Sequence, residues 1–274
     1  MDRSHADANR ANWDERADIH YRDETGFYRI DDVVAGRPVL TAIERRELPA
    51  LDGKSVAHFQ CHIGTDTLSV KLLGAASVTG LDFSGRALIR ARDLARRAGL
   101  EARFVEGSVY DAVALLGESY DLVFTSWGTI TWLDDLRAWA SAVAGVLRPG
   151  GQFYFADSHP VAHLFEDAPD GGIELHFDYR AARGAPVSND VEVTYTGSPE
   201  KLRNIRTYEW QHSLGDVLNA LVGAGLVIDF VHEHDEIPWM MFSNMVPGRD
   251  KGMFRLPDGH VRLPMAWSIM AHKP

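Results

Sequence analysis

The chain has 274 residues, of which 45% are hydrophobic, and this is enough for one large buried core. Its 28 basic and 39 acidic residues leave a formal net charge of −11, which disfavours nucleic acid as a partner because that binding depends on neutralising phosphates. The charged N-terminus lacks the apolar run of a signal peptide, and no stretch approaches ~18 unbroken apolar residues. The single cysteine, Cys61, excludes an internal disulfide and a thiolate-rich zinc site. We therefore expect a cytoplasmic protein that binds a small molecule and no membrane.

Residues 1–50 form a polar segment that favours helix and precedes the expected core. Its aromatic side chains, with Trp13 and Tyr21 as the main candidates, are suited to cover a cleft and contact a cofactor. We expect residues 1–50 to be an N-terminal helical cap and residues 51–274 to be the catalytic domain.

Short apolar runs alternate with helical patterns after residue 55. One predicted helix, residues 85–98, has apolar residues on one face and five arginines expected to face solvent, and Gly99 ends it. A second predicted helix, residues 134–147, ends at a turn over residues 148–151. The alternation predicts a doubly wound, mostly parallel α/β sheet. Its first strands are expected at residues 56–59, 77–81, 103–105, 122–124 and 153–156.

Between about residues 160 and 211 the pattern changes to pieces that favour strand, residues 173–177 and 191–195, separated by turn residues. We expect an antiparallel β insertion there, with a role in substrate binding. Ser213 and Asp216 form a capping-box signal for a helix that runs to Ala224. Strands over residues 226–231 and 266–271 complete the predicted sheet.

The order of strand, glycine turn, helix and strand ending in an acid predicts an adenosine site. In such sheets, ligands bind beyond the carboxyl ends of the strands, where Gly64 would let the backbone approach closely. Asp82 follows 18 residues after Gly64, near the ~20 expected of an acid that accepts hydrogen bonds from ribose hydroxyls. The alternative is that Asp82 caps the next helix, although Ser84 is equally suited to that role.

Several runs resemble class I S-adenosylmethionine (SAM)-dependent methyltransferases, and specifically their bacterial small-molecule branch. They are residues 56–64, 120–127, 147–151 and 153–155. The resemblance implies a Rossmann-like seven-stranded sheet and SAM as cofactor. That family usually has an acid and three glycines around the first turn. Here His58 stands at the acid position, Gln60 and His62 replace the first two glycines, and Gly64 remains.

The resemblance also implies which residues contact the cofactor. The positively charged sulfonium of SAM is attracted to aromatic faces, and its adenine needs apolar walls with a backbone donor. Trp127 is a candidate neighbour of the sulfonium, although an ordinary core tryptophan is the alternative. The expected cofactor contacts within the core are His58, Gln60, Gly64, Asp82, Phe83, Ser108, Val109, Ser126 and Trp127.

Two histidines are candidate catalytic residues in positions that resemble active-site positions of this branch. His159 follows the fifth predicted strand, and His212 precedes the helix that begins at Ser213. We expect a small-molecule methyl acceptor, with methyl transfer to an oxygen or nitrogen atom. A neutral imidazole can remove the acceptor's proton, and His212 is the first choice for this base. The alternative for each is a structural histidine that donates to a backbone carbonyl.

Other functions fit the sequence less well. Residues 232–236, His-Glu-His-Asp-Glu, suggest metal ligands, but consecutive strand residues point to opposite faces and a solvated strand end explains the charges. A nicotinamide-dependent reductase would need G-x-G-x-x-G after the first strand, which is absent. A non-catalytic adenosine-binding module would not need the long insertion. The acceptor's identity and the oligomeric state do not follow from the sequence.

Overall fold

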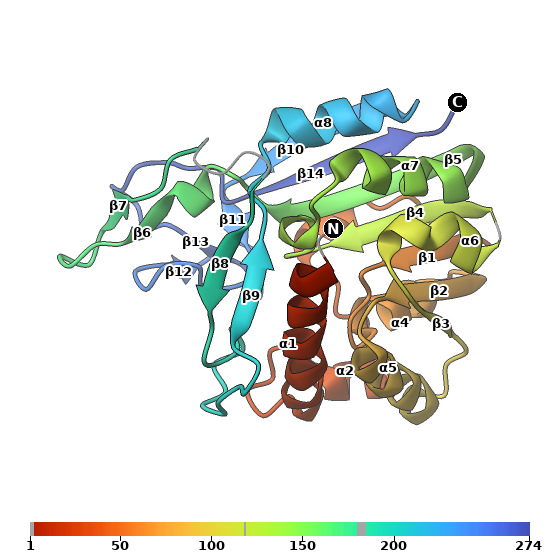
Figure 1. Ribbon diagram of the computed structural model, residues 1–274, viewed down its shortest axis with the longest axis horizontal. Coiled ribbons are helices and arrows are strands. Elements are labelled where there is room, and N and C mark those ends of the chain that lie inside the picture. The colour runs from red at the N-terminus through yellow and green to blue at the C-terminus, as the bar shows by residue number, and fades with distance from the viewer. Residues whose placement is uncertain (1–2, 118, 180–184) are drawn as a thin grey trace.

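A computed structural model describes residues 3–117, 119–179 and 185–274, and its central element is a seven-stranded sheet (Figure 1). The strand order is β3-β2-β1-β4-β5-β14-β10. The first five of these strands pair in parallel, whereas β14 is antiparallel to both of its neighbours. The predicted doubly wound, mostly parallel sheet is therefore confirmed. The strands are β1 Ser55–Phe59, β2 Ser77–Asp82, β3 Arg103–Glu106, β4 Tyr120–Ser126, β5 Leu147–Ser158, β10 Val227–His234 and β14 Ala266–His272.

Helices cover both faces of the sheet, so most strand residues are buried on either side. One face packs against α6 (Ala112–Leu116), α7 (Leu136–Val146) and α8 (Leu214–Gly223), with Trp139 wholly buried at its centre. The other face packs against α4 and α5 and the chain that precedes β1. The elements on that side are α2 Ile30–Val34, α3 Ala42–Glu47, α4 Thr65–Leu72 and α5 Gly85–Ala98.

The predicted capping signals are present in the structure. The Ser213 and Asp216 side chains form the reciprocal capping box at the start of α8. At α5, the Ser84 hydroxyl accepts from the Ala87 N–H, and Gly99 ends the helix in the left-handed conformation. These local devices fix the two helices at the residues that the sequence indicates.

Two predicted features are wrong. Residues 148–151 lie within β5 instead of a separate turn, because the pairing with β4 shifts at this point and Gly150 adopts a φ of 74°. Residues 191–195 form no strand; the pairing instead joins β8 (Val187–Asp190) to β9 (Arg206–Glu209). Val193 forms only an isolated bridge with Lys201, and Val193 and Tyr195 are exposed, so strand propensity alone does not extend the pairing into a strand.

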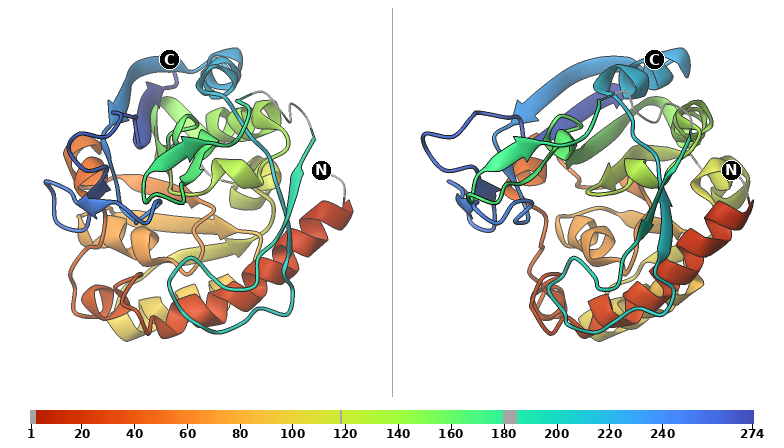
Figure 2. Two further views of the ribbon diagram at one scale, coloured as in Figure 1. Left: turned by 90° about the vertical axis from the view of Figure 1, so that its left-hand side faces the viewer. Right: turned by 60° about the vertical axis from the view of Figure 1, so that its left-hand side comes forward.

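Two groups of short strands gather beyond the carboxyl ends of β4 and β5 (Figures 1 and 2). The expected antiparallel insertion contains the pair β6 (Phe165–Asp167) and β7 (Ile173–Leu175), followed by β8 and β9. A second insertion, between β10 and β14, was not predicted. It forms a three-stranded sheet from β11 Glu236–Ile237, β12 Val246–Pro247 and β13 Phe254–Arg255.

The N-terminal helix α1 (Arg3–Arg22) packs between α5 and β9 (Figures 1 and 2). Asp18 forms ion pairs with Arg86 and Arg90 of α5. On its other side, the Asn9 side chain exchanges hydrogen bonds with the Tyr208 backbone. The expectation that the α5 arginines only face solvent is therefore wrong for Arg86 and Arg90, which pair with Asp18 of the cap, and for Arg97, which donates to Tyr21. No helix in the described part of the chain is long and apolar enough to span a membrane.

Candidate functional site

The loop after β1 keeps a left-handed backbone at three alternate residues. The φ angles are 55° at Gln60, 50° at His62 and 80° at Gly64. Gln and His adopt this region at an energetic cost, which is typical of functional sites. A Cβ on Gly64 would lie 3.0 Å from Ala91 Cβ and 3.1 Å from the Phe104 ring. The close approach that requires Gly64 is thus to α5 and β3, and its contact with a ligand stays a prediction.

Asp82 connects this loop to the start of α5. Its Oδ2 accepts from the His62 N–H at 2.8 Å, and its Oδ1 accepts from the Ser84 N–H at 2.9 Å. The N-cap of α5 is Ser84, so the alternative role proposed for Asp82 is already filled. Burial raises the pKa of Asp82 to about 6. Further hydrogen-bond donors near this carboxylate would stabilise its charged form.

Three other expected cofactor residues lie beside Asp82. Phe83 is half-buried directly after β2. Ser108 and Val109 follow β3, whose last residue pairs with Asp82 across the sheet. The Ser108 hydroxyl accepts from the Tyr110 N–H and starts a short 3-10 helix, Val109–Asp111, while the Val109 side chain packs in the core. Because β2 and β3 are parallel neighbours, the residues that follow them lie at the same end of the sheet as Asp82.

His58, expected to contact the cofactor, bonds to the neighbouring helix instead. Its Nδ1 lies 2.8 Å from Thr67 Oγ1 on α4, and its ring packs 4.7 Å from the Phe124 ring. Burial lowers its pKa to about 3, so the imidazole is neutral near pH 7. The contacts of His58 hold α4 against β1 and β4.

The cap places aromatic and imidazole rings against the loop after β1. The Trp13 ring lies 5.1 Å from the His62 ring and 5.3 Å from the Trp132 ring, with the latter in a 3-10 helix, Ile130–Trp132. His20 Nδ1 lies 2.8 Å from His62 Nε2. Tyr21, expected to join Trp13, contacts α5 instead: it bonds to Asp93 and receives a 3.0 Å hydrogen bond from Arg97. The cap therefore brings only Trp13 of the two candidates to the loop.

The loop after β4 is organised by Asp157, which the sequence analysis did not single out. Its carboxylate accepts from the Gly128 N–H at 2.7 Å and the Thr129 N–H at 3.1 Å. The Gln60 amide donates to the Thr129 carbonyl at 2.8 Å and so joins the loops after β1 and β4. Trp127 adopts a φ of 49° and packs edge-on against Trp239 at 5.8 Å. Asp157 could have been singled out from the sequence, because it is an acid at the end of the fifth predicted strand.

Many buried polar atoms near these loops have no hydrogen-bond partner. Such atoms are costly when they stay unsatisfied, so their concentration indicates a site that a ligand completes. The cap and the strand ends both contribute. In the core these atoms are Glu44 Oε1, Gln60 Oε1, Ser126 Oγ, Trp127 Nε1 and Thr129 Oγ1, and in the cap they are Asn12 Oδ1, Trp13 Nε1, Arg16 Nε and His20 Nε2.

The two candidate catalytic histidines have different partners and are not brought together. His212 Nε2 bonds to the Leu133 carbonyl at 2.6 Å, as the structural alternative expects. His159 Nδ1 accepts from the Val161 N–H at 3.1 Å, and its Nε2 lies 3.0 Å from Glu233 Oε1 without hydrogen-bond geometry. His159 is buried, and burial lowers the pKa of both imidazoles.

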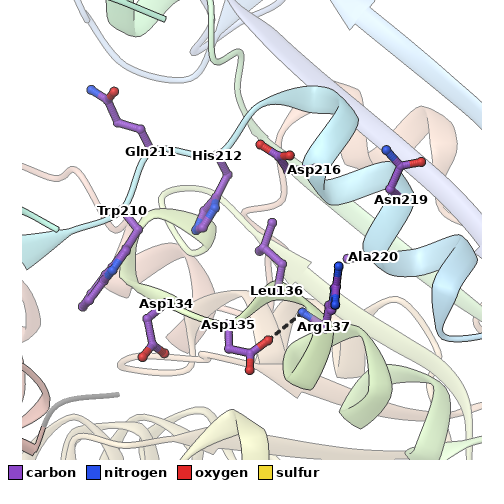
Figure 3. Close-up of a pocket in the computed structure, with 10 residues that line it drawn as sticks. All are labelled: Asp134, Asp135, Leu136, Arg137, Trp210, Gln211, His212, Asp216, Asn219 and Ala220. Atoms are coloured by element: carbon purple, nitrogen blue, oxygen red, sulfur yellow. Dashed lines mark hydrogen bonds between the residues drawn. The ribbon is translucent and has the colours of Figure 1, made fainter. Parts of the chain in front are cut away.

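His212 also lines a pocket of about 470 Å³ between the starts of α7 and α8 (Figure 3). None of the expected cofactor residues lines this pocket. Its lining residues are Asp134, Asp135, Leu136, Arg137, Trp210, Gln211, His212, Asp216, Asn219 and Ala220.

His232 and His234, considered as metal ligands, both approach Glu47 of α3. His232 Nδ1 lies 2.8 Å and His234 Nε2 lies 3.6 Å from Glu47 Oε1. Across the described residues, no group of three or more side chains is arranged to hold a metal ion. The contacts of His232 and His234 pack β10 against α3.

Known proteins share both the domain and the fold. Residues 56–151 match the model of a family described as a methyltransferase domain. The chain is 26% identical over 158 residues to the uncharacterized methyltransferase YbaJ of Bacillus subtilis, a match that covers 58% of this chain and 60% of that protein. The chain thus spans about 60% of the length of this curated relative.

Solved structures agree with the fold over most of the chain. DhpI, in complex with SAH, superposes with a TM-score of 0.59 at 17% identity and full coverage of both chains. A SAM-dependent methyltransferase of Mesorhizobium loti superposes with a TM-score of 0.57 at 20% identity, covering 84% of this chain and 96% of that one. Residues 56–151 are therefore a methyltransferase domain, and the chain as a whole has the fold of SAM-dependent methyltransferases.

Proposed function

We propose that this chain binds SAM at the carboxyl ends of β1, β2 and β4 and transfers its methyl group to an oxygen or nitrogen atom of a small-molecule acceptor. The observation that carries the proposal is the set of unsatisfied buried polar atoms between α1 and the loops after β1 and β4. The sulfonium of SAM supplies an electrophilic methyl group. The protein's part is to orient the reactants and exclude water.

Asp82 fits the ribose of this cofactor. Two backbone N–H groups already fix its carboxylate, and each oxygen retains a further acceptor site for a hydroxyl. Burial raises the pKa of this carboxylate, and hydrogen bonds from two vicinal hydroxyls would stabilise its charged form. Phe83, Ser108 and Val109 lie along the same edge and are the proposed neighbours of the adenine.

Arg16 fits the carboxylate of the methionine part. Its side chain is only 4% exposed, and the guanidinium lies over the Trp13 ring at 5.3 Å and the Tyr195 ring at 5.7 Å. Within the described ranges it has no acidic side chain at ion-pair distance, and its Nε has no partner. A buried cation without a counterion is costly, so a bound anion would stabilise this arrangement. Arg16 carries no signal in the sequence, because its helix is polar throughout.

The acceptor is proposed to enter between the two insertions and the loop after β4. The net charge of −11 favours a small molecule over a polyanion. His212 is proposed as the base through Nδ1, because the bond from Nε2–H to the Leu133 carbonyl leaves Nδ1 as the nitrogen with a lone pair. Burial lowers its pKa and so keeps the ring neutral near pH 7. His159 is proposed as a contact that helps to bind the acceptor.

The proposal is tested by incubating the protein with isotope-labelled SAM and a panel of phenols, amines and carboxylates, with mass spectrometry of the products. We expect labelled methyl on one class of acceptor and stoichiometric formation of SAH. A protein that binds SAM and transfers no methyl group across a broad panel would support a non-catalytic adenosine-binding module instead.

A further inference from the structure

Two acidic side chains meet under the loop after β1, on the sheet face that α3 and α4 cover. Glu44, in α3, is 1% exposed, and Asp66 lies in the first turn of α4. Asp66 is near enough for its charge to raise the pKa of Glu44, after the larger effect of burial. In the described residues, neither carboxylate has a lysine or arginine at ion-pair distance.

Hydrogen bonds satisfy only part of this acidic pair. Glu44 Oε2 accepts from the Thr41 N–H at 2.7 Å in a capping box, and this fixes the carboxylate's orientation. The other oxygen, Oε1, is buried without a partner. The Ser126 hydroxyl, on a residue that is 6% exposed, approaches Asp66, and its hydrogen bond lowers the pKa of that carboxyl. Two carboxylates from α3 and α4 and a hydroxyl from β4 therefore converge, and Glu44 Oε1 is left without a hydrogen bond of normal geometry.

From this geometry we propose that Glu44, Asp66 and Ser126 bind an ammonium group. A protonated amine has three N–H donors and a positive charge, which match the two carboxylates and the hydroxyl oxygen. The Trp127 indole borders the same space, and its N–H approaches Glu44 closely enough to lower the pKa of that carboxyl. Two ligands of the proposed function carry such a group: the α-amino group of SAM's methionine part, or an amine acceptor. The identification of these two ligands rests on the proposed function.

The electrostatics around Glu44 and Asp66 favour binding of a cation. Burial and the neighbouring Asp66 raise the pKa of Glu44 to about 8, and burial raises the pKa of Asp66 to about 6. The other titratable groups that interact with the pair bring no positive charge: Tyr154 of β5, which bonds to Glu47 of α3, lies near Glu44, and Tyr28 and Tyr195 lie near Asp66. Without a ligand, Glu44 is mostly protonated at pH 7, and a bound ammonium would return it to the charged form.

The test compares Glu44→Gln and Asp66→Asn with wild type by calorimetric titration. The probes are SAH, an SAH analogue without the α-amino group, and 5′-methylthioadenosine, which lacks the whole amino-acid part. Glu47→Gln, on the same helix but outside the cluster, is the matched control. If the ammonium is the cofactor's, Glu44→Gln and Asp66→Asn weaken SAH at least tenfold and leave the two smaller probes unchanged. Wild type then also releases about one proton per SAH at pH 7, and Glu44→Gln releases almost none.

If SAH affinity is unchanged but transfer to amines falls at least tenfold while transfer to phenols does not, the ammonium belongs to the acceptor. If both variants match wild type in SAH affinity, proton release and amine methylation, the proposed ammonium site is wrong. Failure of wild type itself to bind SAH would instead overturn the proposed function. Because glutamine is neutral like protonated Glu44, the Glu44→Gln variant is expected to fold, and its melting temperature checks this.

Discussion

His20 Nδ1 and His62 Nε2 lie 2.8 Å apart, so the N-terminal cap is hydrogen-bonded to the strained loop that follows β1. Both rings are neutral: burial, with a contribution from nearby positive charge, lowers the pKa of His20 and brings the pKa of His62 to about 3. One ring therefore donates and the other accepts. The residue that replaces the family's second glycine is thus held by the cap, which couples the cap to the proposed cofactor site.

Deletion of residues 1–30 should abolish methyl transfer, because it removes Trp13, Arg16 and His20 from the site. The sheet should stay folded, since its strands and the helices α4 to α8 lie after residue 50. The melting temperature should nevertheless fall, because Ala17, Ile19 and Ile30 are buried. Circular dichroism and the transfer assay measure the two effects. Full activity in the truncated protein would show that the cap does not take part in the site.

Asp82→Asn should weaken SAH by about 1.5 to 3 kcal/mol, the usual value for hydrogen bonds to a charged group, or roughly ten- to a hundredfold. Ser84→Ala is the control, because it removes the α5 cap and should cost about 1 kcal/mol of stability with little change in affinity. Titration calorimetry and thermal melts distinguish these effects. Unchanged SAH affinity in Asp82→Asn together with a large fall in melting temperature would assign Asp82 a structural role.

His212→Ala should lower kcat by about 10²- to 10⁴-fold if His212 is the base, with SAH affinity preserved. The rate of wild type should rise with pH through the imidazole titration, at a pH below the usual value because burial lowers the pKa of His212. His159→Ala should act mainly on the acceptor's KM. A His212→Ala protein with normal kcat and reduced stability would show that the bond to the Leu133 carbonyl is its only role.

His58→Asn should flatten the dependence of stability on pH. His58 has a pKa of about 3 in the folded protein, below its value of ~6.5 in the unfolded chain. The unfolded chain therefore binds more protons below pH 6.5, so this contribution to stability is complete above pH ~6.5 and is lost as the pH falls toward 3. The slope attributable to His58 is about 1.4 kcal/mol per pH unit. Urea unfolding of both proteins at several pH values measures it, and identical slopes would contradict the assignment.

The sequence predicted the sheet because its signals are local. Buried strands, the Ser213–Asp216 capping box and Gly99 each depend on neighbours within one or two turns of chain. The second insertion, between β10 and β14, was missed because its strands have two residues each and carry no periodicity to detect.

The site was predicted in part. Asp82 and Gln60 follow strands, and parallel strands bring their carboxyl ends to one edge, so their proximity follows from topology. Arg16, Glu44 and Asp157 were missed because each acts through contacts with residues distant in sequence. Asp157 holds the loop around Gly128, about 30 residues earlier, by tertiary hydrogen bonds. Tyr21 and His58 were expected at the cofactor and instead bond to helices, which residue type alone does not distinguish.

The central claim is that the edge beside Asp82 binds the adenosine and methionine parts of SAM. Calorimetric titration of the purified protein with SAH, and in parallel with NAD and NADP, tests it most directly. We predict saturable binding of SAH at one site per chain and no binding of either nicotinamide nucleotide, because the loop after β1 offers no G-x-G-x-x-G cradle for a pyrophosphate. Saturable binding of NAD or NADP without binding of SAH would contradict the account.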